Sequence, residues 1–226
     1  MKKPELIVML TKNDQTVANA REVFQTCANS AAQCWGAKEV GLPPKALKEL
    51  YAAFKDHGKT SFMEVVAYKE DDCMAGAKLA QACGCDVLLG TCFFDSVNQF
   101  CLDHGLKYMP FIGKVYNRPS VLEGTAQQML DQLAAYSEKG VYGADLLGYR
   151  HITDGYGISK AVISQASLPI CLAGSIDSYQ RLDQVLAINP AWFTIGGAFF
   201  DGKFGSDFTA QINSVCDYMQ GAVLAP

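Results

Sequence analysis

The chain has 226 residues, of which 50% are hydrophobic and 19% are charged, and its formal net charge is −4. This composition predicts one large globular domain, and the negative charge argues against general binding to nucleic acid or to an anionic membrane. Its apolar runs are shorter than the roughly 18 residues that a membrane-spanning helix requires, so we expect a cytoplasmic protein.

Short apolar segments alternate with helical patterns along the chain. We expect strands at residues 5–10, 35–40, 61–67, 86–89, 108–113, 144–148, 169–173 and 192–196. Between them, apolar residues recur with helical spacing, as in residues 43–56 and 125–139. Eight strand–helix units in a chain of this length predict the α/β class, with one domain folded as a (β/α)8 TIM barrel.

The two halves of the chain resemble each other. At a shift of 106 residues, the segment that begins at Leu88 aligns with the segment that begins at Thr194, and Asp71 aligns with Asp177. Each half spans about four strand–helix units. The pattern predicts a duplicated half-barrel, with halves of about 1–106 and 107–226.

Two glycine-containing corners follow the seventh and eighth expected strands. Gly174-Ser175 lies in the segment LAGSIDS, and Gly196-Gly197-Ala198 lies in FTIGGAFF. Glycine lets the backbone approach an anion closely, and amides at the start of a helix attract phosphate. Because the loops after strands seven and eight of a barrel often bind phosphate, we predict a phosphate site at these five residues. A short extra helix is expected at residues 198–200.

These two motifs and the repeat resemble the phosphate-binding TIM-barrel superfamily. The nearest types are the half-barrel duplicates of histidine biosynthesis (isomerase/cyclase type), followed by sugar-phosphate epimerases and aldolases. The resemblance covers the whole chain as architecture, and it implies a phosphorylated small-molecule substrate. The histidine-pathway isomerases carry acid–base carboxylates at the ends of strands one and five. Here those segments read Leu10-Thr11-Lys12 and Gly113-Lys114, and Asp14 lies further out, so the resemblance implies the scaffold rather than that reaction.

Ionisable residues within or just after the apolar strands are the catalytic candidates, because a buried charge must be paired or face a pocket. Lys38 and Glu39 lie in the second strand, Glu64 lies in the third, and Lys114 follows the fifth. A Lys–Glu pair in a partly dry pocket can move a proton beside a carbonyl group. A desolvated lysine can instead form a Schiff base. A purely structural ion pair inside the barrel is the remaining alternative.

Substrate contacts are expected from residues that follow other strands. Tyr149 and Arg150 come after the sixth strand, where a guanidinium group suits an anion clamp. Lys69 and the Gly90-Thr91 corner mark an alternative second anion site after strands three and four. Residues 116–120, which include Arg118, are long enough to form a lid over the pocket.

The nine cysteines are scattered, and we expect them to be buried thiols. Ligand spacing for a metal is missing, so we expect neither a metal nor another cofactor. These patterns favour an isomerase or epimerase that acts on a small phosphorylated sugar or related metabolite by proton transfer. A Schiff-base aldolase or lyase and a non-catalytic regulatory barrel that binds a phosphorylated metabolite are the alternatives. The oligomeric state is left open, and a homo-oligomer is one alternative.

Overall fold

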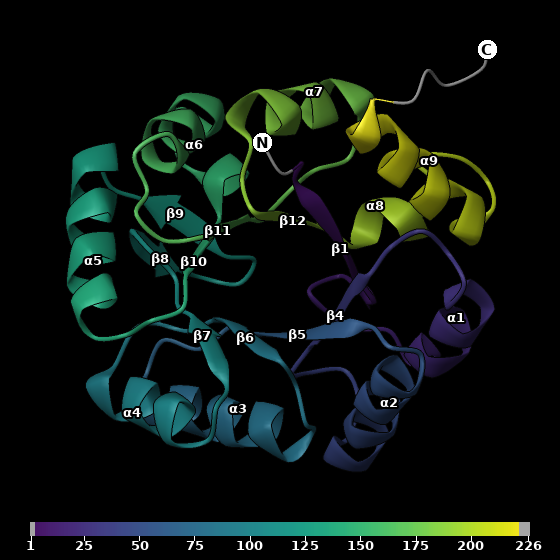
Figure 1. Cartoon of the computed structure of the whole chain (residues 1–226), viewed down its shortest axis with the longest axis horizontal. Coiled ribbons are helices and arrows are strands. Elements are labelled where there is room, and N and C mark those ends of the chain that lie inside the picture. Colours follow the sequence, from purple (N-terminus) through teal and green to yellow (C-terminus); the bar gives the residue numbers. More distant parts are fainter. Residues whose placement is uncertain (1–2, 222–226) are drawn as a thin grey trace.

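A computed structural model describes residues 3–221 and has eight parallel strands that form a barrel inside a ring of helices (Figure 1). The order of the strands around the sheet is β10, β11, β12, β1, β4, β5, β6 and β7. In chain order, their bounds are β1 (Glu5–Met9), β4 (Cys34–Lys38), β5 (Thr60–Val65), β6 (Val87–Gly90), β7 (Lys107–Met109), β10 (Ala144–Leu146), β11 (Ile170–Leu172) and β12 (Trp192–Ile195). The expected (β/α)8 barrel is confirmed.

The barrel is closed between the chain after β7 and the strand β10. The amide of Asp145 donates to the carbonyl of Pro110 at 2.9 Å, and the amide of Ile112 donates to the carbonyl of Asp145 at 3.3 Å. Proline has no amide hydrogen, so Pro110 interrupts the regular ladder. The expected strand at residues 108–113 therefore ends early as β7, and the rest of it runs as irregular chain.

Helices surround the strands on the outside of the barrel (Figure 1). They are α1 (Ala20–Cys27), α2 (Pro44–Asp56), α3 (Glu70–Ala82), α4 (Asp95–Asp103), α5 (Ala126–Glu138), α6 (Gly155–Ile163), α7 (Tyr179–Ile188), α8 (Gly197–Phe200) and α9 (Phe208–Gln220), with a 3₁₀ turn, η1 (Gly148–Arg150). The bounds of helices α2 and α5 agree closely with the helices expected at residues 43–56 and 125–139. The short helix α8 lies where a short extra helix was expected.

Two antiparallel hairpins were not foreseen from the sequence. One joins β2 (Thr11–Lys12) to β3 (Gln15–Thr16) just after β1, and the other joins β8 (Lys114–Tyr116) to β9 (Val121–Glu123) after β7. Each strand of these hairpins has only two or three residues, too few to give a clear alternating pattern. Both hairpins lie at the carboxyl ends of barrel strands.

Side chains alternate between the inside and the outside of the barrel, as the pleat of a strand requires. One buried cluster fills the interior and comprises Ile7, Met9, Cys34, Phe62, Val87, Leu89, Met109 and Cys171. A larger cluster packs strands against helices and includes Val8, Leu50 and Phe54. In β4, the alternation that begins with Cys34 brings Lys38 to the inside and leaves Glu39 on the other side.

The strands of each half of the sequence are neighbours in the barrel. β1, β4, β5 and β6 come from the first half, and β7, β10, β11 and β12 come from the second. The duplication of a half-barrel remains a prediction. In the part of the chain that the structure describes, no helix is long and apolar enough to cross a membrane.

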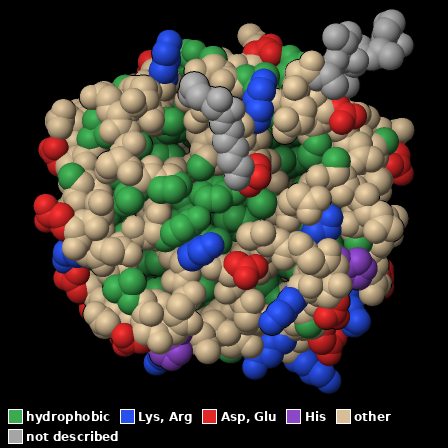
Figure 2. All heavy atoms as spheres, viewed as in Figure 1, with side chains coloured by type: hydrophobic (Ala, Val, Ile, Leu, Met, Phe, Trp, Pro, Cys, Tyr) green, Lys and Arg blue, Asp and Glu red, His purple; other side chains and the backbone are tan. Residues whose placement is uncertain are grey.

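Figure 2 shows the face of the molecule from which Figure 1 is viewed. Hydrophobic side chains gather near its middle, and acidic and basic side chains are interspersed around them, most of them toward the edge. A broad surface of one charge is therefore not seen on this face, which agrees with the nearly balanced charge of the chain.

Candidate active site at the carboxyl ends of the strands

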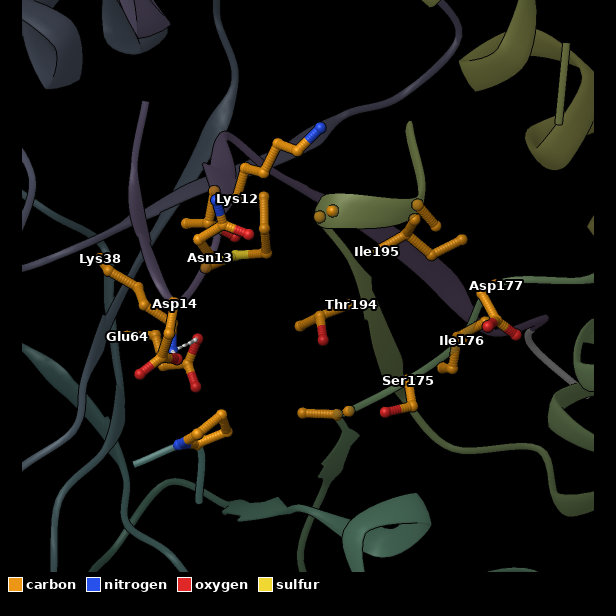
Figure 3. Close-up of a pocket in the computed structure, with 18 of the residues that line it drawn as sticks. Lys12, Asn13, Asp14, Lys38, Glu64, Ser175, Ile176, Asp177, Thr194 and Ile195 are labelled. Atoms are coloured by element: carbon orange, nitrogen blue, oxygen red, sulfur yellow. Dashed lines mark hydrogen bonds and ion pairs between the residues drawn. The ribbon is translucent and has the colours of Figure 1, made fainter. Parts of the chain in front are cut away.

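A cavity of about 910 Å³, here called the site cavity, opens among the segments that follow β1, β4, β11 and β12. Figure 3 shows its polar residues in two groups. Asp14, Lys38 and Glu64 lie together on one side, and Ser175 and Thr194 lie across the open space from them. Active sites of (β/α)8 enzymes occupy this end of the barrel. The site cavity is thus the candidate active site.

Lys38 is the centre of the first group. Its Nζ makes an ion pair with Oδ1 of Asp14 and lies 3.4 Å from Oε2 of Glu64. The side chain of Lys38 is 7% exposed, and the two carboxylates are about 15% exposed. Lys38 and Glu64 pair in register on β4 and β5, so the alternation of both strands turns both side chains inward.

The charge of Lys38 follows from its partners. Burial by itself would lower the pKa of the ammonium group, but Glu64 and Asp14 outweigh burial, and the pKa of Lys38 is raised. Lys38 is therefore protonated near neutral pH. It can stabilise a developing negative charge or donate a proton, whereas nucleophilic attack would require the neutral amine.

Asp14 reaches this group because of the β2–β3 hairpin. Asn13 and Asp14 form its tight turn with φ angles of 51° and 61°, a left-handed conformation that Asn and Asp tolerate. The hydroxyl of Thr16 donates to the carbonyl of Lys38 at 2.8 Å and accepts from the Lys38 amide at 2.9 Å. These bonds attach the hairpin to β4 and bring the carboxylate of Asp14 to the ammonium group.

Arg118 engages the other oxygen of Asp14. Its Nε lies 2.6 Å from Oδ2 of Asp14, and its second terminal nitrogen lies 3.3 Å from Oε1 of Glu39. Burial raises the pKa of Asp14, but Lys38 and Arg118 outweigh that effect, and the pKa of Asp14 is lowered. Arg118 thus joins the loop after β8 to the site through two carboxylates.

Asp145 is a further acidic residue close to this group. It lies at the centre of β10, its side chain is fully buried, and neither carboxyl oxygen has a hydrogen-bond partner. Burial raises the pKa of Asp145 well above its ordinary value, and the charge of Glu64 adds to the rise. The surroundings of Asp145 therefore favour the neutral carboxylic acid over the carboxylate.

The corner after β11 carries the backbone expected of an anion site. Gly174 has a φ of 92°, and Ser175 has a φ of 52°, which is a strained conformation for a residue with a side chain. A Cβ atom on Gly174 would lie 2.9 Å from Cγ of Arg150, so the arginine side chain passes close to the glycine. Both corner residues line the site cavity.

The corner after β12 leads into α8, and Gly196, Gly197 and Ala198 also line the site cavity. The first amides of a helix have no partner within the helix. The hydrogen bonds found among residues 3–221 use none of the amides of Gly174, Ser175, Gly196, Gly197 or Ala198 as donors. Because β11 and β12 are adjacent parallel strands, the two corners lie side by side at one end of the barrel. Their amides are available to an anion.

At the alternative anion corner after β6, by contrast, the backbone amides are already used in internal hydrogen bonds. The amide of Thr91 donates to the carbonyl of Val65 at 2.8 Å, and the amide of Cys92 donates to the carbonyl of Ala67 at 3.0 Å. Lys69 lines a separate cavity of about 480 Å³ between β5 and α3. The internal hydrogen bonds leave this corner poorly suited to bind an anion.

The structure brings together only some of the residues singled out from the sequence. Lys38, Glu64 and Arg150 line the site cavity with the two glycine corners. Glu39 lines the smaller cavity with Lys69, where burial raises its pKa. The ring of Tyr149 lies 3.9 Å below the guanidinium group of Arg181 on α7, and Tyr149 is not among the residues that line the site cavity.

Lys114 lies apart from the site cavity. It begins β8, its side chain is 73% exposed, and its Nζ lies 3.1 Å from Oε2 of Glu123 across the β8–β9 hairpin. The chain leaves the barrel ladder after Pro110, so Lys114 belongs to a surface hairpin rather than to the end of a barrel strand. The role expected for Lys114 at the mouth of the barrel has no geometric support.

Neither Asp14 nor Asp145 was predicted from the sequence to be a site residue. Asp145 interrupts the apolar run ADLLG, the same signal that singled out Glu64, so this residue could have been found. For Asp14 the available signal was the Asn13-Asp14 pair, which is typical of a two-residue hairpin turn. Among the described residues, no group of three or more His, Cys, Asp or Glu side chains is arranged to hold a metal ion.

Neither a protein-family model nor a curated protein matches the sequence. Several solved structures match over almost their whole length. KDPGal aldolase is 15% identical with a TM-score of 0.69, and the alignment covers 99% of this chain and 98% of that one. Orotidine 5′-phosphate decarboxylase from Pyrococcus horikoshii OT3 is 10% identical with a TM-score of 0.69, covering 96% and 99%.

N-acetylmannosamine-6-phosphate 2-epimerase from Clostridium perfringens is 11% identical with a TM-score of 0.62, and the alignment covers 98% of this chain and 94% of that one. These structural neighbours are phosphate-binding TIM-barrel enzymes. The resemblance expected from the sequence is therefore confirmed for the fold. At such low identity the comparison does not extend to the reaction.

Proposed function

We propose that this protein is an isomerase or epimerase that acts on a small phosphorylated sugar or related metabolite by proton transfer. One observation carries the proposal. The protonated Lys38 lies between two carboxylates on one side of the site cavity, and two corners with available amides lie on the other side. A ligand with a phosphate at one end and a carbonyl group at the other would place the phosphate at the two corners and the carbonyl group beside Lys38.

The phosphate would bind the amides of Gly174, Ser175, Gly196, Gly197 and Ala198. The five amides have no acceptor among the described residues and belong to residues that line the site cavity, so they can bind an anion through the backbone. Arg150 lines the same cavity and packs against Gly174, so its guanidinium group is placed to add a charge-assisted contact. The names of two structural neighbours, which include a 5′-phosphate and a 6-phosphate, support a phosphorylated substrate.

Glu64 is the residue that we assign as the base. Asp14 is engaged through both oxygens, by Lys38 and by Arg118, and this lowers its pKa and its basicity. Among the described side chains, Glu64 forms an ion pair with Lys38 alone. Glu64 would remove a proton from the carbon next to the carbonyl group, and Lys38 would stabilise or protonate the resulting enediolate oxygen.

The return of the proton determines the product. Delivery to the neighbouring carbon gives an isomer, and delivery to the opposite face of the same carbon gives an epimer. A Schiff-base lyase would need Lys38 as a neutral amine, and the raised pKa of Lys38 disfavours that route. A regulatory barrel would use the phosphate corners alone and would leave the Lys38 group without a role.

A two-stage experiment tests the proposal. Thermal melting is first measured with a panel of phosphorylated aldoses and ketoses and with the same sugars lacking phosphate. We expect Tm to rise only with phosphorylated members. Each stabilising compound is then incubated with the protein in deuterium oxide, and we expect deuterium to appear at one carbon next to the carbonyl group.

The competing functions give different results in the same experiment. Covalent labelling of Lys38 by borohydride in the presence of a ligand would show an imine and replace the proposal with the lyase. A rise in Tm without deuterium incorporation or turnover for any stabilising compound would replace it with the regulatory barrel.

A further inference from the structure

Thr194 lies in the site cavity, and the proposed reaction gives it no role. It belongs to β12 and lines the cavity, and Figure 3 shows it between Lys38 and the corner that carries Ser175. Thr194 is partly exposed, and no hydrogen bond of its hydroxyl is found within residues 3–221. The hydroxyl is therefore available to a ligand in the cavity.

The alternation of β12 turns Thr194 toward the inside of the barrel. Its neighbours on the strand, Phe193 and Ile195, belong to the cluster that packs strands against helices. Thr194 also pairs in register with Ile7 on β1, which is part of the interior cluster. The side chain of Thr194 therefore faces inward, at the place where the apolar interior of the barrel meets the site cavity.

Thr194 is also close to the proposed phosphate corner after β12. Gly196, the first residue of that corner, follows Thr194 by two positions, a separation of about 7 Å along a strand. A ligand whose phosphate is bound at the corners would extend from there toward Lys38. Because Thr194 lies between these two places, the middle of the carbon chain of such a ligand would pass the Thr194 hydroxyl.

Thr194 differs from the other polar residues that the barrel strands contribute to the site cavity. The lining residues on the eight barrel strands are Met9, Lys38, Glu64, Thr194 and Ile195. Lys38 and Glu64 are paired with each other. The Thr194 hydroxyl keeps its full capacity to donate and to accept a hydrogen bond. A valine would have the same shape in the strand, so the hydroxyl itself points to recognition of a polar group.

We propose that Thr194 is a specificity-determining residue, whose hydroxyl binds a hydroxyl group on the carbon chain of the substrate between the phosphate and the carbonyl group. This inference rests on the proposed function. It narrows the substrate to phosphorylated compounds with a free hydroxyl at that position. A deoxy analogue would leave the Thr194 hydroxyl without a partner, and a site built to bind a substrate hydroxyl discriminates against the analogue that lacks it.

Two small probes separate the hydroxyl contact from the rest of the ligand. Racemic α-glycerophosphate has a hydroxyl group on its central carbon, and its deoxy analogue lacks only this group. Calorimetry should show that the unaltered protein binds α-glycerophosphate about threefold to tenfold more tightly than the deoxy analogue, as expected for one neutral hydrogen bond. Thr194→Val keeps the shape of the side chain without the hydroxyl, so both probes should bind it equally. Thr194→Ser keeps the hydroxyl and should preserve the preference.

Two controls accompany the probes. Thr26→Val on α1 removes an exposed hydroxyl that donates to the carbonyl of Glu22, outside the site, and it should keep the preference for α-glycerophosphate. Inorganic phosphate has no hydroxyl-bearing carbon chain, so its affinity should be the same in all four proteins. A missing preference in the unaltered protein, or a preference that persists in Thr194→Val, would overturn the inference.

The same contact is tested in turnover with the substrate identified by deuterium exchange. The hydroxyl contact is made equally before and during proton transfer, so Thr194→Val should raise KM about threefold to tenfold and leave kcat nearly unchanged. Thr194→Ser should behave as the unaltered protein does. A purely structural role would instead lower Tm and kcat in Thr194→Val without any change in the preference between the two probes, and that result would exclude the role in specificity.

The two proposals fail in different ways. If no compound exchanges deuterium, the proposed function fails, whereas the two probes still decide whether Thr194 recognises the hydroxyl group of a bound phosphate ester. If exchange occurs but the unaltered protein does not distinguish the probes, the proposed function survives and only the role of Thr194 is lost.

Discussion

Nζ of Lys38 lies 3.4 Å from Oε2 of Glu64, and the two residues pair in register on the neighbouring strands β4 and β5. The lysine and the glutamate, paired across adjacent strands and both turned into the barrel, form a largely buried ion pair, which we propose as the acid–base unit. This ion pair lies across the site cavity from the corner of Ser175 (Figure 3), and this arrangement supports the proposal of a phosphorylated substrate.

Replacement of Lys38 by Met should reduce kcat by a factor of about 10² to 10⁴, because the enediolate loses its positive partner. The variant also leaves Asp14 and Glu64 without their shared cation, so the rate is measured below the Tm of the variant. Lys114→Met is the matched control, since Lys114 is an exposed lysine with a carboxylate partner outside the site. Equal losses in both variants would contradict the assignment of Lys38.

Replacement of Gly174 by Ala should weaken the binding of inorganic phosphate about tenfold. The new Cβ would lie 2.9 Å from Cγ of Arg150, and a φ of 92° is strained for alanine, so the corner must shift. Calorimetry gives the dissociation constant. Gly58→Ala introduces similar strain at a φ of 66° where no atom lies within 4 Å, and it should leave phosphate binding unchanged.

Asp145→Asn should stabilise the protein increasingly as pH rises. The folded-state pKa of Asp145 lies above its unfolded value, so the stability linked to this group is complete below pH of about 4 and declines as pH rises toward the folded-state pKa. The decline is about 1.4 kcal/mol for each pH unit in that window. Denaturant unfolding of both proteins at several pH values measures the difference, and a constant difference from acidic to alkaline pH would contradict a buried neutral acid.

Arg118→Gln should destabilise the protein at neutral pH by about 1 kcal/mol or less, because the guanidinium group is partly exposed. The folded-state pKa of Asp14 is lowered, so its ion pairs stabilise the fold above the unfolded pKa and are lost as pH falls through the folded-state value. The difference between the two proteins should therefore shrink below pH of about 4. Arg21→Gln, which removes the exposed pair with Glu49, is the comparison variant.

The pattern of the sequence was sufficient for the barrel and for the positions of the two glycine corners, whereas phosphate binding at these corners stays a prediction. Alternating apolar segments predicted the eight strands with small errors at their ends, because strand periodicity and glycine punctuation are local properties of the chain. Gly174-Ser175 and Gly196-Gly197 could be found for the same reason, since a glycine corner after a strand is visible in the sequence. The fifth strand was predicted too long because Pro110 ends its ladder.

Tertiary structure decided which charged residues lie together around Lys38. A shift of one residue turns a side chain to the other face of a strand, so only the register shows that Lys38 faces inward and Glu39 does not. The β2–β3 hairpin returns Asp14 to the site, and the irregular chain after β7 carries Lys114 away from it. The pKa of Asp145 is raised because strands distant in sequence bury it in the barrel interior and bring the charge of Glu64 near it. Local patterns determine which elements form, whereas contacts between distant strands determine which charges share one dry site.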